Sequence, residues 1–334
     1  MLPVAHTVFA ARGLLEVVLP RYDLGSVRDC RLLQHNQNDT YRVCADHGWF
    51  ILKVYQAQAS YTPRGAHIAY EVDLLRYLHG RGVAVAVPID ARDGRCTIRL
   101  EAPEGDRLAV LFSDAPGGPV PASEWDDAFS RGFGAVVGSM HAAAADFRRR
   151  SAAPLRLDQA HLLRQPLRLA RPFFAHRPDD WAYIRTLAQR LERRLDALAR
   201  RGLSPGICHG DLVGRTNVHR GPSGVLTLYD FECCGPGWRA YDIGVFRWAL
   251  AQLVSPARAK QLVAAFLDAY QERCPLTPAD LEAITTFVAV RHFWFMGLRT
   301  GNAQHWGQGE VDDPALDELV AFWRAWEPSL AEPG

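Results

Sequence analysis

Long apolar segments and an excess of charge of either sign are both missing from this 334-residue sequence. Nowhere do eighteen apolar residues occur together, and residues 1–19 lack a basic leader followed by an apolar run. We therefore expect a cytoplasmic protein without a membrane as partner. The 38 basic and 37 acidic side chains give a formal net charge of +1, so there is no electrostatic reason to expect binding to nucleic acid.

Cysteine pairs at metal-binding or redox spacing are missing as well. The seven cysteines are odd in number and include no C-x-x-C pair, which argues against a disulfide framework and against a zinc site. The adjacent Cys233 and Cys234 are expected to be two packed thiols. Lysine is also scarce, since there are only two and arginine supplies the other positive charges. Because lysine is rare here, the position of Lys53 inside the apolar run 50–55 suggests a specific role for this residue.

The first hundred or so residues are predicted to form strands with one helix among them. Short β-branched and aromatic runs alternate with Asn, Asp and Gly, which is typical of strands joined by turns. A segment with apolar residues at helical spacing follows the third run. The expected order is three strands, a helix and two more strands: Val27–Leu33, Thr40–Cys44, Trp49–Tyr55, the helix Pro63–Gly80, Cys96–Leu100 and Arg107–Phe112.

Proline and glycine are dense in one passage that is placed to connect two large parts of the chain, Ala115–Pro121. The length and the 48% hydrophobic content are enough for a core on each side of it. We expect an N-terminal lobe over residues 1–114, a linker over 115–122 and a C-terminal lobe over 123–334. The last is predicted to be mostly helical, with amphipathic candidates at Ser123–Arg149, Asp180–Arg201, Pro256–Arg273, Pro278–Arg299 and Pro314–Trp326.

Two carboxylates and an amide stand close together in the segment 207–232. Asp211 follows Ile-Cys-His-Gly, Asn217 leads into a short apolar stretch, and Asp230 ends the run 225–229. Phosphoryl transfer from ATP needs one group that orients the attacking hydroxyl and accepts its proton, and others that hold Mg²⁺ against the phosphates. The segment therefore indicates a kinase, with Asp211 as the base and Asn217 and Asp230 as metal ligands.

These residues carry a resemblance to a known family. The His209-Gly210-Asp211 motif, Asn217 and the Asp230-Phe231-Glu232 motif resemble the signature of the aminoglycoside phosphotransferase and choline kinase superfamily. The resemblance implies an α+β, bilobal, protein-kinase-like fold, with a small N-terminal lobe of antiparallel sheet and one helix and a larger, mainly helical C-terminal lobe. It also implies ATP and Mg²⁺ as cofactors.

The same resemblance implies supporting roles for two further residues. His209 is expected to brace the loop that carries Asp211, and Asp242, in Ala-Tyr-Asp-Ile-Gly, matches a second family aspartate that holds this loop without touching substrate. Glu232 is a candidate for a metal or water contact beside Asp230 and for a contact to the substrate.

Two features depart from the family pattern. The family asparagine comes five residues after the aspartate, but Thr216 holds that position here and Asn217 follows it. We favour Asn217 because it leads into a strand, and Thr216 is the alternative. The nucleotide loop 34–40 has no glycine. Its Asn38 and Thr40 are candidate nucleotide contacts because Asn and Asp turn readily, although a plain hairpin turn fits equally well.

Lys53 is expected to contact the nucleotide phosphates. A lysine in an apolar strand needs a partner, and kinases use one there to bind phosphates and to pair with a helix glutamate. Glu71, eighteen residues further on, is the expected partner. The alternative is that Lys53 reaches the sheet edge and Glu71 is exposed. The adenine is expected at the lobe connection, with Phe112, Ser113 and Asp114 as the neighbouring residues.

The hydroxyl acceptor is expected in the C-terminal lobe. The segment Thr300–Gly309 is predicted to be a loop that borders the substrate, although packing against the lobe is equally compatible. Candidate substrate contacts are Arg299, His305 and Trp306. Cations such as Arg291 would suit an acidic or amino-acid acceptor. An acidic pocket would suit an aminoglycoside, with contributions from Asp179, Asp180, Glu310, Asp312 and Asp313.

The sequence favours an ATP-dependent phosphotransferase that acts on a hydroxyl of a small molecule, namely an amino alcohol, amino acid, sugar or antibiotic. The layout is closest to the homoserine-kinase and stress-response-kinase branch, so a protein Ser/Thr kinase is an alternative. A kinase-like nucleotide-binding protein without turnover is another, because of the glycine-free loop and the shifted asparagine. A monomer or homodimer is expected.

Overall fold

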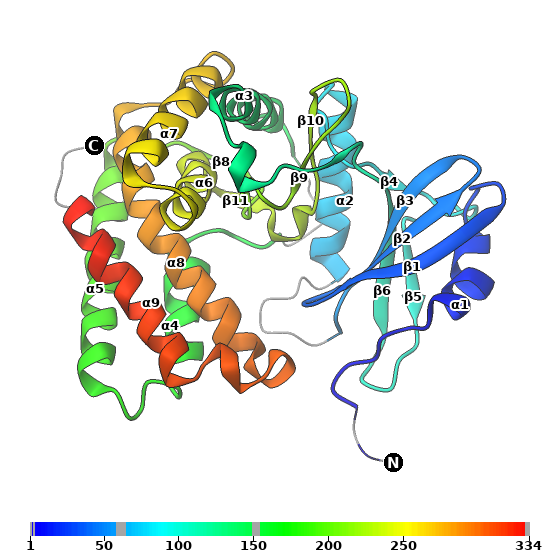
Figure 1. Cartoon of the computed structure of the whole chain (residues 1–334), viewed down its shortest axis with the longest axis horizontal. Coiled ribbons are helices and arrows are strands. Elements are labelled where there is room, and N and C mark those ends of the chain that lie inside the picture. The colour runs from blue at the N-terminus through cyan, green and yellow to red at the C-terminus, as the bar shows by residue number, and fades with distance from the viewer. Residues whose placement is uncertain (1, 3, 58–64, 149–153, 331–334) are drawn as a thin grey trace.

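The chain folds into a small lobe built on a β-sheet and a larger helical lobe, in a computed structural model that describes residues 2, 4–57, 65–148 and 154–330. Figure 1 shows the sheet at the N-terminal end of the molecule and the helices packed against one another beyond it. The α+β, bilobal architecture expected from the sequence is therefore confirmed.

The N-terminal lobe is an antiparallel sheet with the strand order β1-β2-β3-β6-β4, and β5 also pairs with β6. Its strands alternate between buried and partly exposed side chains, as in β2, because one face packs on a core. The short β4 was not predicted, since a two-residue strand leaves no periodic pattern. The strands are β1 Val27–His35, β2 Asp39–Ala45, β3 Gly48–Val54, β4 Pro88–Ile89, β5 Thr97–Leu100 and β6 Arg107–Ser113.

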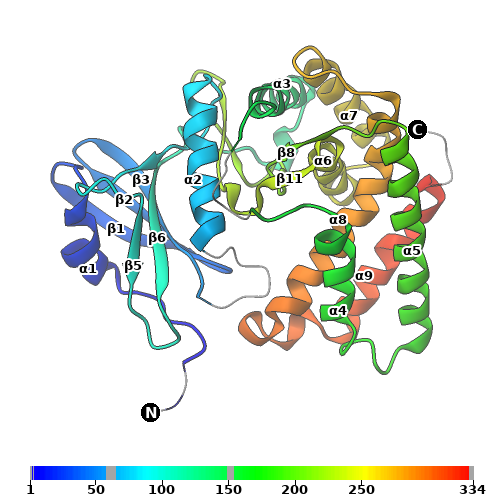
Figure 2. The same ribbon diagram turned by 180° about the vertical axis from the view of Figure 1, so that it is seen from behind.

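Helical segments cover both faces of this sheet. Helix α2, Gly65–Gly80, stands between the sheet and the C-terminal lobe (Figure 2), and its apolar side chains share a core with both. On the other face, a short helical segment packs on the buried side of β2 and β3. That segment consists of α1 Ala11–Gly13, a π-helical turn Leu14–Val18 and a 3₁₀ turn Leu19–Arg21. The predicted start of the helix at Pro63 lies outside the described residues.

The C-terminal lobe is built around helix α8, Pro278–Trp306, which is buried along most of its length. A capping box between Thr277 and Asp280 begins this helix, because each side chain bonds the other residue's backbone N–H. The other helices of this lobe are α3 Asp127–Ala144, α4 Gln165–Ala170, α5 Pro178–Arg200, α6 Arg239–Leu253, α7 Pro256–Gln271 and α9 Asp313–Trp326.

One expectation for the helices was wrong, and one long helix was not predicted. Helix α8 continues to Trp306, where a loop over Thr300–Gly309 was expected. The side-chain donors of Thr300 and Asn302 bond to carbonyls one turn back, at 2.9 and 2.8 Å, so these polar residues are accommodated within the helix. Helix α6 was not predicted, because it is apolar on nearly all sides and shows no helical period. Arg149, the expected end of α3, lies outside the described residues.

The linker joins the lobes through a small sheet. Strand β7, Gly118–Pro119, pairs with β9, Val218–Arg220, which in turn pairs with β10, Leu226–Leu228. A second pair joins β8, Pro205–Cys208, to β11, Gly235–Trp238. These two small sheets fix the segment 207–232 at the junction of the lobes. None of the helices in the described part of the chain has the length and apolar character needed to cross a membrane.

Candidate active site

A cavity of about 550 Å³ lies at the junction of the two lobes. Both lobes contribute to it, since its walls come from the β1–β2 hairpin, β3, α2, the linker, the segment 211–232 and the C-terminal end of α8. Among the residues that line it are Asn36, Gln37, Thr40, Arg42, Lys53, Glu71, Phe112, Ser113, Asp114, Asp211, Thr216, Asn217, His219, Tyr229, Asp230, Glu232, Leu298 and Trp306.

The loop 209–217 follows β8 and is held in place by Asp242. This buried carboxylate accepts hydrogen bonds from the backbone N–H groups of His209 and Gly210, both at 2.8 Å, and contacts His141 Nε2 at 3.0 Å. Gly210 has a left-handed φ of 87°, and a Cβ there would lie 2.4 Å from the Cys233 carbonyl oxygen. Only glycine fits this turn without displacing the backbone.

The buried His209 uses both of its ring nitrogens within the protein. Its Nε2 lies 3.0 Å from the Tyr229 carbonyl oxygen, and its Nδ1 accepts from the Asp211 N–H at 3.3 Å. Its ring also packs on Phe231, with the centroids 4.3 Å apart. With both nitrogens occupied, His209 has the contacts of a bracing residue.

Asp211 is contacted by an amide on one side and a guanidinium on the other. Asn217 Nδ2 donates to its Oδ2 at 2.8 Å and to its backbone carbonyl at 2.7 Å, while Arg291 of α8 pairs with its Oδ1. Arg291 is buried and lies 4.0 Å from the centroid of the Trp294 ring. The sequence offered Arg291 as a cation for the acceptor, but the structure places it against the proposed base.

Asn217 and Asp230 share an unusual backbone conformation. They are the two non-glycine residues with positive φ in the described part of the chain, at 69° and 63°. Such strain concentrates at functional sites, where the surrounding structure holds it. Asn217 is buried and points its amide at Asp211, whereas Thr216 is exposed. The geometry therefore favours Asn217 over Thr216 as the candidate metal ligand.

Lys53 forms ion pairs across the junction of the lobes, with Asp230 and with Glu232 at 2.6 Å. The expected pair with Glu71 is not formed. Tyr55 instead donates to the Glu71 carboxylate at 2.9 Å, and the two C-terminal carboxylates together attract the ammonium more strongly than one. Burial lowers the pKa of Lys53, but the nearby carboxylates outweigh burial and hold it well above its usual value.

Two carboxyl groups in this cavity hold their protons unusually tightly. Burial raises the pKa of Glu71 to about 7, although the charge of Lys53 opposes the shift. Burial also raises the pKa of Glu232 to about 7, again opposed by Lys53 and assisted by the negative charge of Asp230. A cluster of desolvated carboxylates around one lysine is a common property of catalytic and phosphate-binding sites.

The candidate nucleotide residues lie in different surroundings. Asn38 does not line the cavity, because its amide bonds to Glu232 and to the Gln56 N–H, the latter at 3.0 Å. Thr40 lines the cavity and pairs with Lys53 across β2 and β3. The lobe-connection residues also line it. Two of them have partners of their own, since Ser113 Oγ accepts from the Val87 N–H at 2.8 Å and Asp114 pairs with Arg42 at 2.9 Å.

The candidate substrate residues do not all reach the cavity. Glu232 and Trp306 line it, but Arg299 pairs with Glu310 at 2.9 Å and His305 is exposed at the end of α8. The expected acidic pocket is not assembled there either, since no member of that set lines the cavity and three of its members pair with basic side chains: Asp180, Glu310 and Asp313.

The oxygen atoms around Asp230 fit a hard divalent cation. Asp230 Oδ2 and the amide oxygen of Asn217 have no hydrogen-bond donor among the described residues, and both side chains line the cavity. Carboxylate and amide oxygens are the protein ligands that Mg²⁺ prefers. Asn217 and Asp230 are therefore the residues that could hold the metal, with Lys53 and Thr40 on the nucleotide side.

Sequence reasoning missed several cavity residues. His219, Tyr229 and Leu298 line the cavity, yet no motif singles them out, whereas Asn36 and Gln37 lie in the expected nucleotide loop 34–40. The link from Arg291 to Asp211 was missed because eighty residues separate the two. The one signal in the sequence that could have indicated this link was an arginine within the apolar part of the predicted helix 278–299.

A profile of the phosphotransferase enzyme family matches residues 29–276. The chain belongs to this family and is a kinase-type enzyme. Its relatives include an uncharacterized protein of Deinococcus radiodurans, 39% identical over 97% of this chain and 92% of the relative. An amicoumacin kinase of Bacillus subtilis is 26% identical over 87% and 85%, and a homoserine kinase of Pseudomonas aeruginosa is 28% identical over 92% of each chain.

Solved structures share the fold. An amicoumacin kinase in complex with AMP-PNP, Ca²⁺ and Ami superposes with a TM-score of 0.71, at 22% identity over 94% of this chain and 96% of that chain. A microcompartment-associated aminopropanol kinase gives a TM-score of 0.69, at 24% identity over 92% of this chain and 93% of that chain. The assignment to the aminoglycoside phosphotransferase and choline kinase superfamily, made from the segment 209–232, is confirmed.

Proposed function

We propose that this protein transfers the γ-phosphoryl group of ATP to the hydroxyl of a small molecule that also carries an amine. One observation carries the proposal: Lys53, Asp211, Asn217 and Asp230, drawn from both lobes, converge on one cavity. That set contains the phosphate cation, the base and the oxygen ligands that phosphoryl transfer requires.

Each side chain has a distinct proposed role in the reaction. Asp211 orients the acceptor hydroxyl and takes its proton as the new O–P bond forms and the bond from the γ-phosphorus to the bridging oxygen breaks, which releases ADP. Lys53 holds the nucleotide phosphates. Asn217 and Asp230 would hold Mg²⁺, which supplies charge neutralisation at the phosphates when it is bound.

The amine on the acceptor is supported by the relatives and by the charge of the site. Aminopropanol and homoserine, named for two of the related kinases, both carry an amine and a hydroxyl. On the C-terminal side of the cavity the charged groups are carboxylates, Asp211, Asp230 and Glu232, while the guanidinium of Arg291 is held by Asp211. A small cation fits this side better than an anion does.

We place the reaction in the cytoplasm. All seven cysteines lie in the described residues and carry free thiols, which supports a reducing compartment. ATP is also abundant there.

A panel assay tests the proposal. The protein is incubated with ATP, Mg²⁺ and separate acceptors, including aminopropanol, homoserine, an aminoglycoside, a neutral sugar and a protein. We expect ADP release and an acceptor heavier by one phosphate group for an amino alcohol. Transfer to the protein acceptor alone would contradict the small-molecule assignment.

Asp211→Asn is the decisive variant in this assay. The amide keeps the shape of the side chain but cannot take a proton, so turnover should fall by at least about a hundredfold while nucleotide binding persists. Nucleotide binding by the parent protein without transfer to any acceptor, and no difference between it and Asp211→Asn, would instead indicate a binding protein without turnover.

A further inference from the structure

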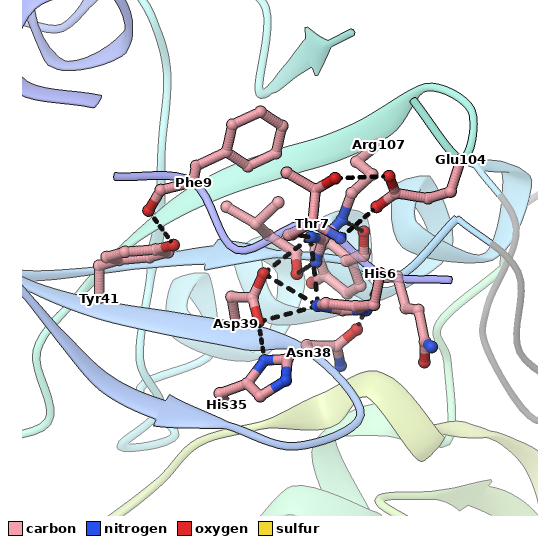
Figure 3. Close-up of polar contacts among 12 residues, drawn as sticks. His6, Thr7, Phe9, His35, Asn38, Asp39, Tyr41, Glu104 and Arg107 are labelled. Atoms are coloured by element: carbon pink, nitrogen blue, oxygen red, sulfur yellow. Dashed lines mark hydrogen bonds and ion pairs between the residues drawn. The ribbon is translucent and has the colours of Figure 1, made fainter. Parts of the chain in front are cut away.

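Two histidines and an aspartate gather at the β1–β2 hairpin (Figure 3), and none of the three lines the cavity of the proposed reaction. His6 Nε2 lies 3.2 Å from Asp39 Oδ1, and His35 Nδ1 lies 2.6 Å from the same oxygen. One nitrogen from each ring and one carboxylate oxygen all lie within 4.8 Å of one another. No step of the proposed reaction uses these three side chains.

Backbone pairing and contacts of neighbouring residues hold the three groups together. His35 and Asp39 are directly opposite in the β1–β2 register, so the hairpin fixes their spacing. The segment that carries His6 is fastened next to them: Thr7 donates to Glu104 through its N–H at 2.8 Å and its hydroxyl at 2.7 Å. The Tyr41 hydroxyl donates to the Phe9 carbonyl at 2.6 Å.

The charged groups around the cluster are two carboxylates and the Arg107 guanidinium, whose Nη1 lies 3.4 Å from His6 Nε2. Asp39 Oδ2 pairs with the buried Arg107 at 2.7 Å and lies 3.3 Å from His6 Nε2, while Oδ1 contacts both histidines. Arg107 also donates to the carbonyls of Val54 at 2.9 Å and Tyr55 at 3.0 Å, which disperses its charge. Glu104 adds a second negative charge beside the one guanidinium.

We propose that His6 Nε2, His35 Nδ1 and Asp39 Oδ1 bind a divalent transition-metal ion of the zinc class. Two imidazoles and one carboxylate are a ligand set that zinc accepts, with water in the remaining position. The His35 side chain is 47% exposed, which provides both an entry path and room for that water. The ion ties the N-terminal segment to the hairpin whose turn, at Asn36 and Gln37, lines the cavity.

Titration with Co²⁺ tests the site directly, because tetrahedral Co²⁺ absorbs visible light. Protein without a histidine tag is titrated in excess Mg²⁺, which occupies the proposed catalytic metal position. We expect one Co²⁺ bound per chain, and His35→Ala should weaken binding at least about tenfold, since even indirect partners of a metal cost that much. His47→Ala, which removes an exposed histidine from the next hairpin, should bind as the parent does.

A second measurement guards against damage to the fold. Zn²⁺ should raise the melting temperature of the parent and of His47→Ala but not of His35→Ala or His6→Ala, because only an intact site binds the native state preferentially. Equal melting temperatures of the parent and the three single variants without metal would show that the variants fold. The proposal is overturned if the parent binds no Co²⁺, or if binding survives in the His6→Ala/His35→Ala double variant. Neither outcome bears on the kinase activity.

Discussion

At the scale of single residues, Asp211 is restrained by contacts to its backbone and to both of its carboxylate oxygens. Its backbone N–H is held by His209, its Oδ2 by Asn217 and its Oδ1 by Arg291. Asp242 in turn fixes the backbone of His209. In the proposed reaction, a carboxylate restrained in this way would already be oriented before substrate arrives, which would lower the entropic cost of the step.

The choice between Asn217 and Thr216 can be tested by a matched pair of alanine variants. Asn217→Ala removes the amide that holds Asp211 and an oxygen that faces the cavity, so kcat should fall by about a hundredfold or more and the Mg²⁺ requirement should rise. Thr216→Ala alters an exposed side chain and should stay within about twofold of the parent. Steady-state kinetics over a Mg²⁺ series measures both. The reverse order of effects would assign the role to Thr216.

Arg291 is expected to act as a positioning residue. Arg291→Ala should lower kcat by about 10- to 100-fold because Asp211 loses a restraint, while the KM for ATP changes little since Arg291 does not line the cavity. Arg291→Lys should recover part of the loss.

Arg299→Ala is the matched control for Arg291, because Arg299 pairs with Glu310 away from Asp211. Its kcat should match that of the parent. A raised KM for ATP with unchanged kcat in Arg291→Ala would contradict the positioning role.

At the scale of elements, the linker is a paired strand that approaches its neighbour closely. Gly117 has a φ of 84°, and a Cβ there would lie 2.0 Å from the Arg220 carbonyl oxygen. This contact lies next to the pairing of β7 with β9, which connects the linker to the segment that carries Asn217. The linker therefore fixes the cavity wall as well as joining the lobes.

Gly117→Ala should destabilise the protein more than a glycine variant that changes backbone conformation alone. Gly82 has a similar φ of 78°, but an added Cβ there would have no atom within 4 Å, so Gly82→Ala should cost about 1–2 kcal/mol. Gly117→Ala adds a backbone clash and should lower the free energy of unfolding further, measured by urea denaturation. Equal losses in the two variants would show that β7 shifts freely away from β9.

At the scale of the whole molecule, buried charges connect the two lobes. Lys53 reaches from β3 to Asp230 and Glu232, and Asn38 reaches from the hairpin to Glu232. His67 of α2 contacts the backbone carbonyl of Glu232 at 2.8 Å. Glu232 thus contacts β3, the β1–β2 hairpin and α2. Its protonation state should therefore affect the contacts between the lobes.

Stability should carry a component that declines as pH rises from about 4.5 to about 7. The pKa values of Glu71 and Glu232 are raised by burial from 4.5 to about 7, so the folded state binds protons that the unfolded state has released. Their contribution is complete below about pH 4.5 and is lost as pH rises through the folded value. Urea denaturation across this range measures it.

Other groups titrate in the same range, so the difference between variants is the useful quantity. Burial lowers the pKa of His161 to about 4, for example, which works in the opposite direction. Glu71→Gln should remove part of the decline with pH, and the exposed Glu16→Gln should leave it unchanged. An identical pH profile for all three proteins would contradict the raised pKa values.

Much of the site could be predicted because its residues are neighbours in sequence. Asp211, Asn217 and Asp230 lie on one segment, so their spacing alone indicated the reaction. The lobes were predictable for a related reason, since period-2 and helical patterns report which face each element buries. The prediction failed at α6 and at the end of α8, where burial on nearly all sides, or polar groups satisfied within the helix, removes the pattern.

The sequence by itself indicated the fold class and the phosphotransferase family, because the strand and helix patterns are local and the segment 209–232 resembles the family signature. Only the tertiary structure decided the partners. Lys53 pairs with Asp230 and Glu232 rather than with Glu71. Arg291 pairs with Asp211 rather than lining an acceptor site, and His6 contacts Asp39. Such pairs join residues far apart in the chain, and packing of the lobes settles which charges share a buried space.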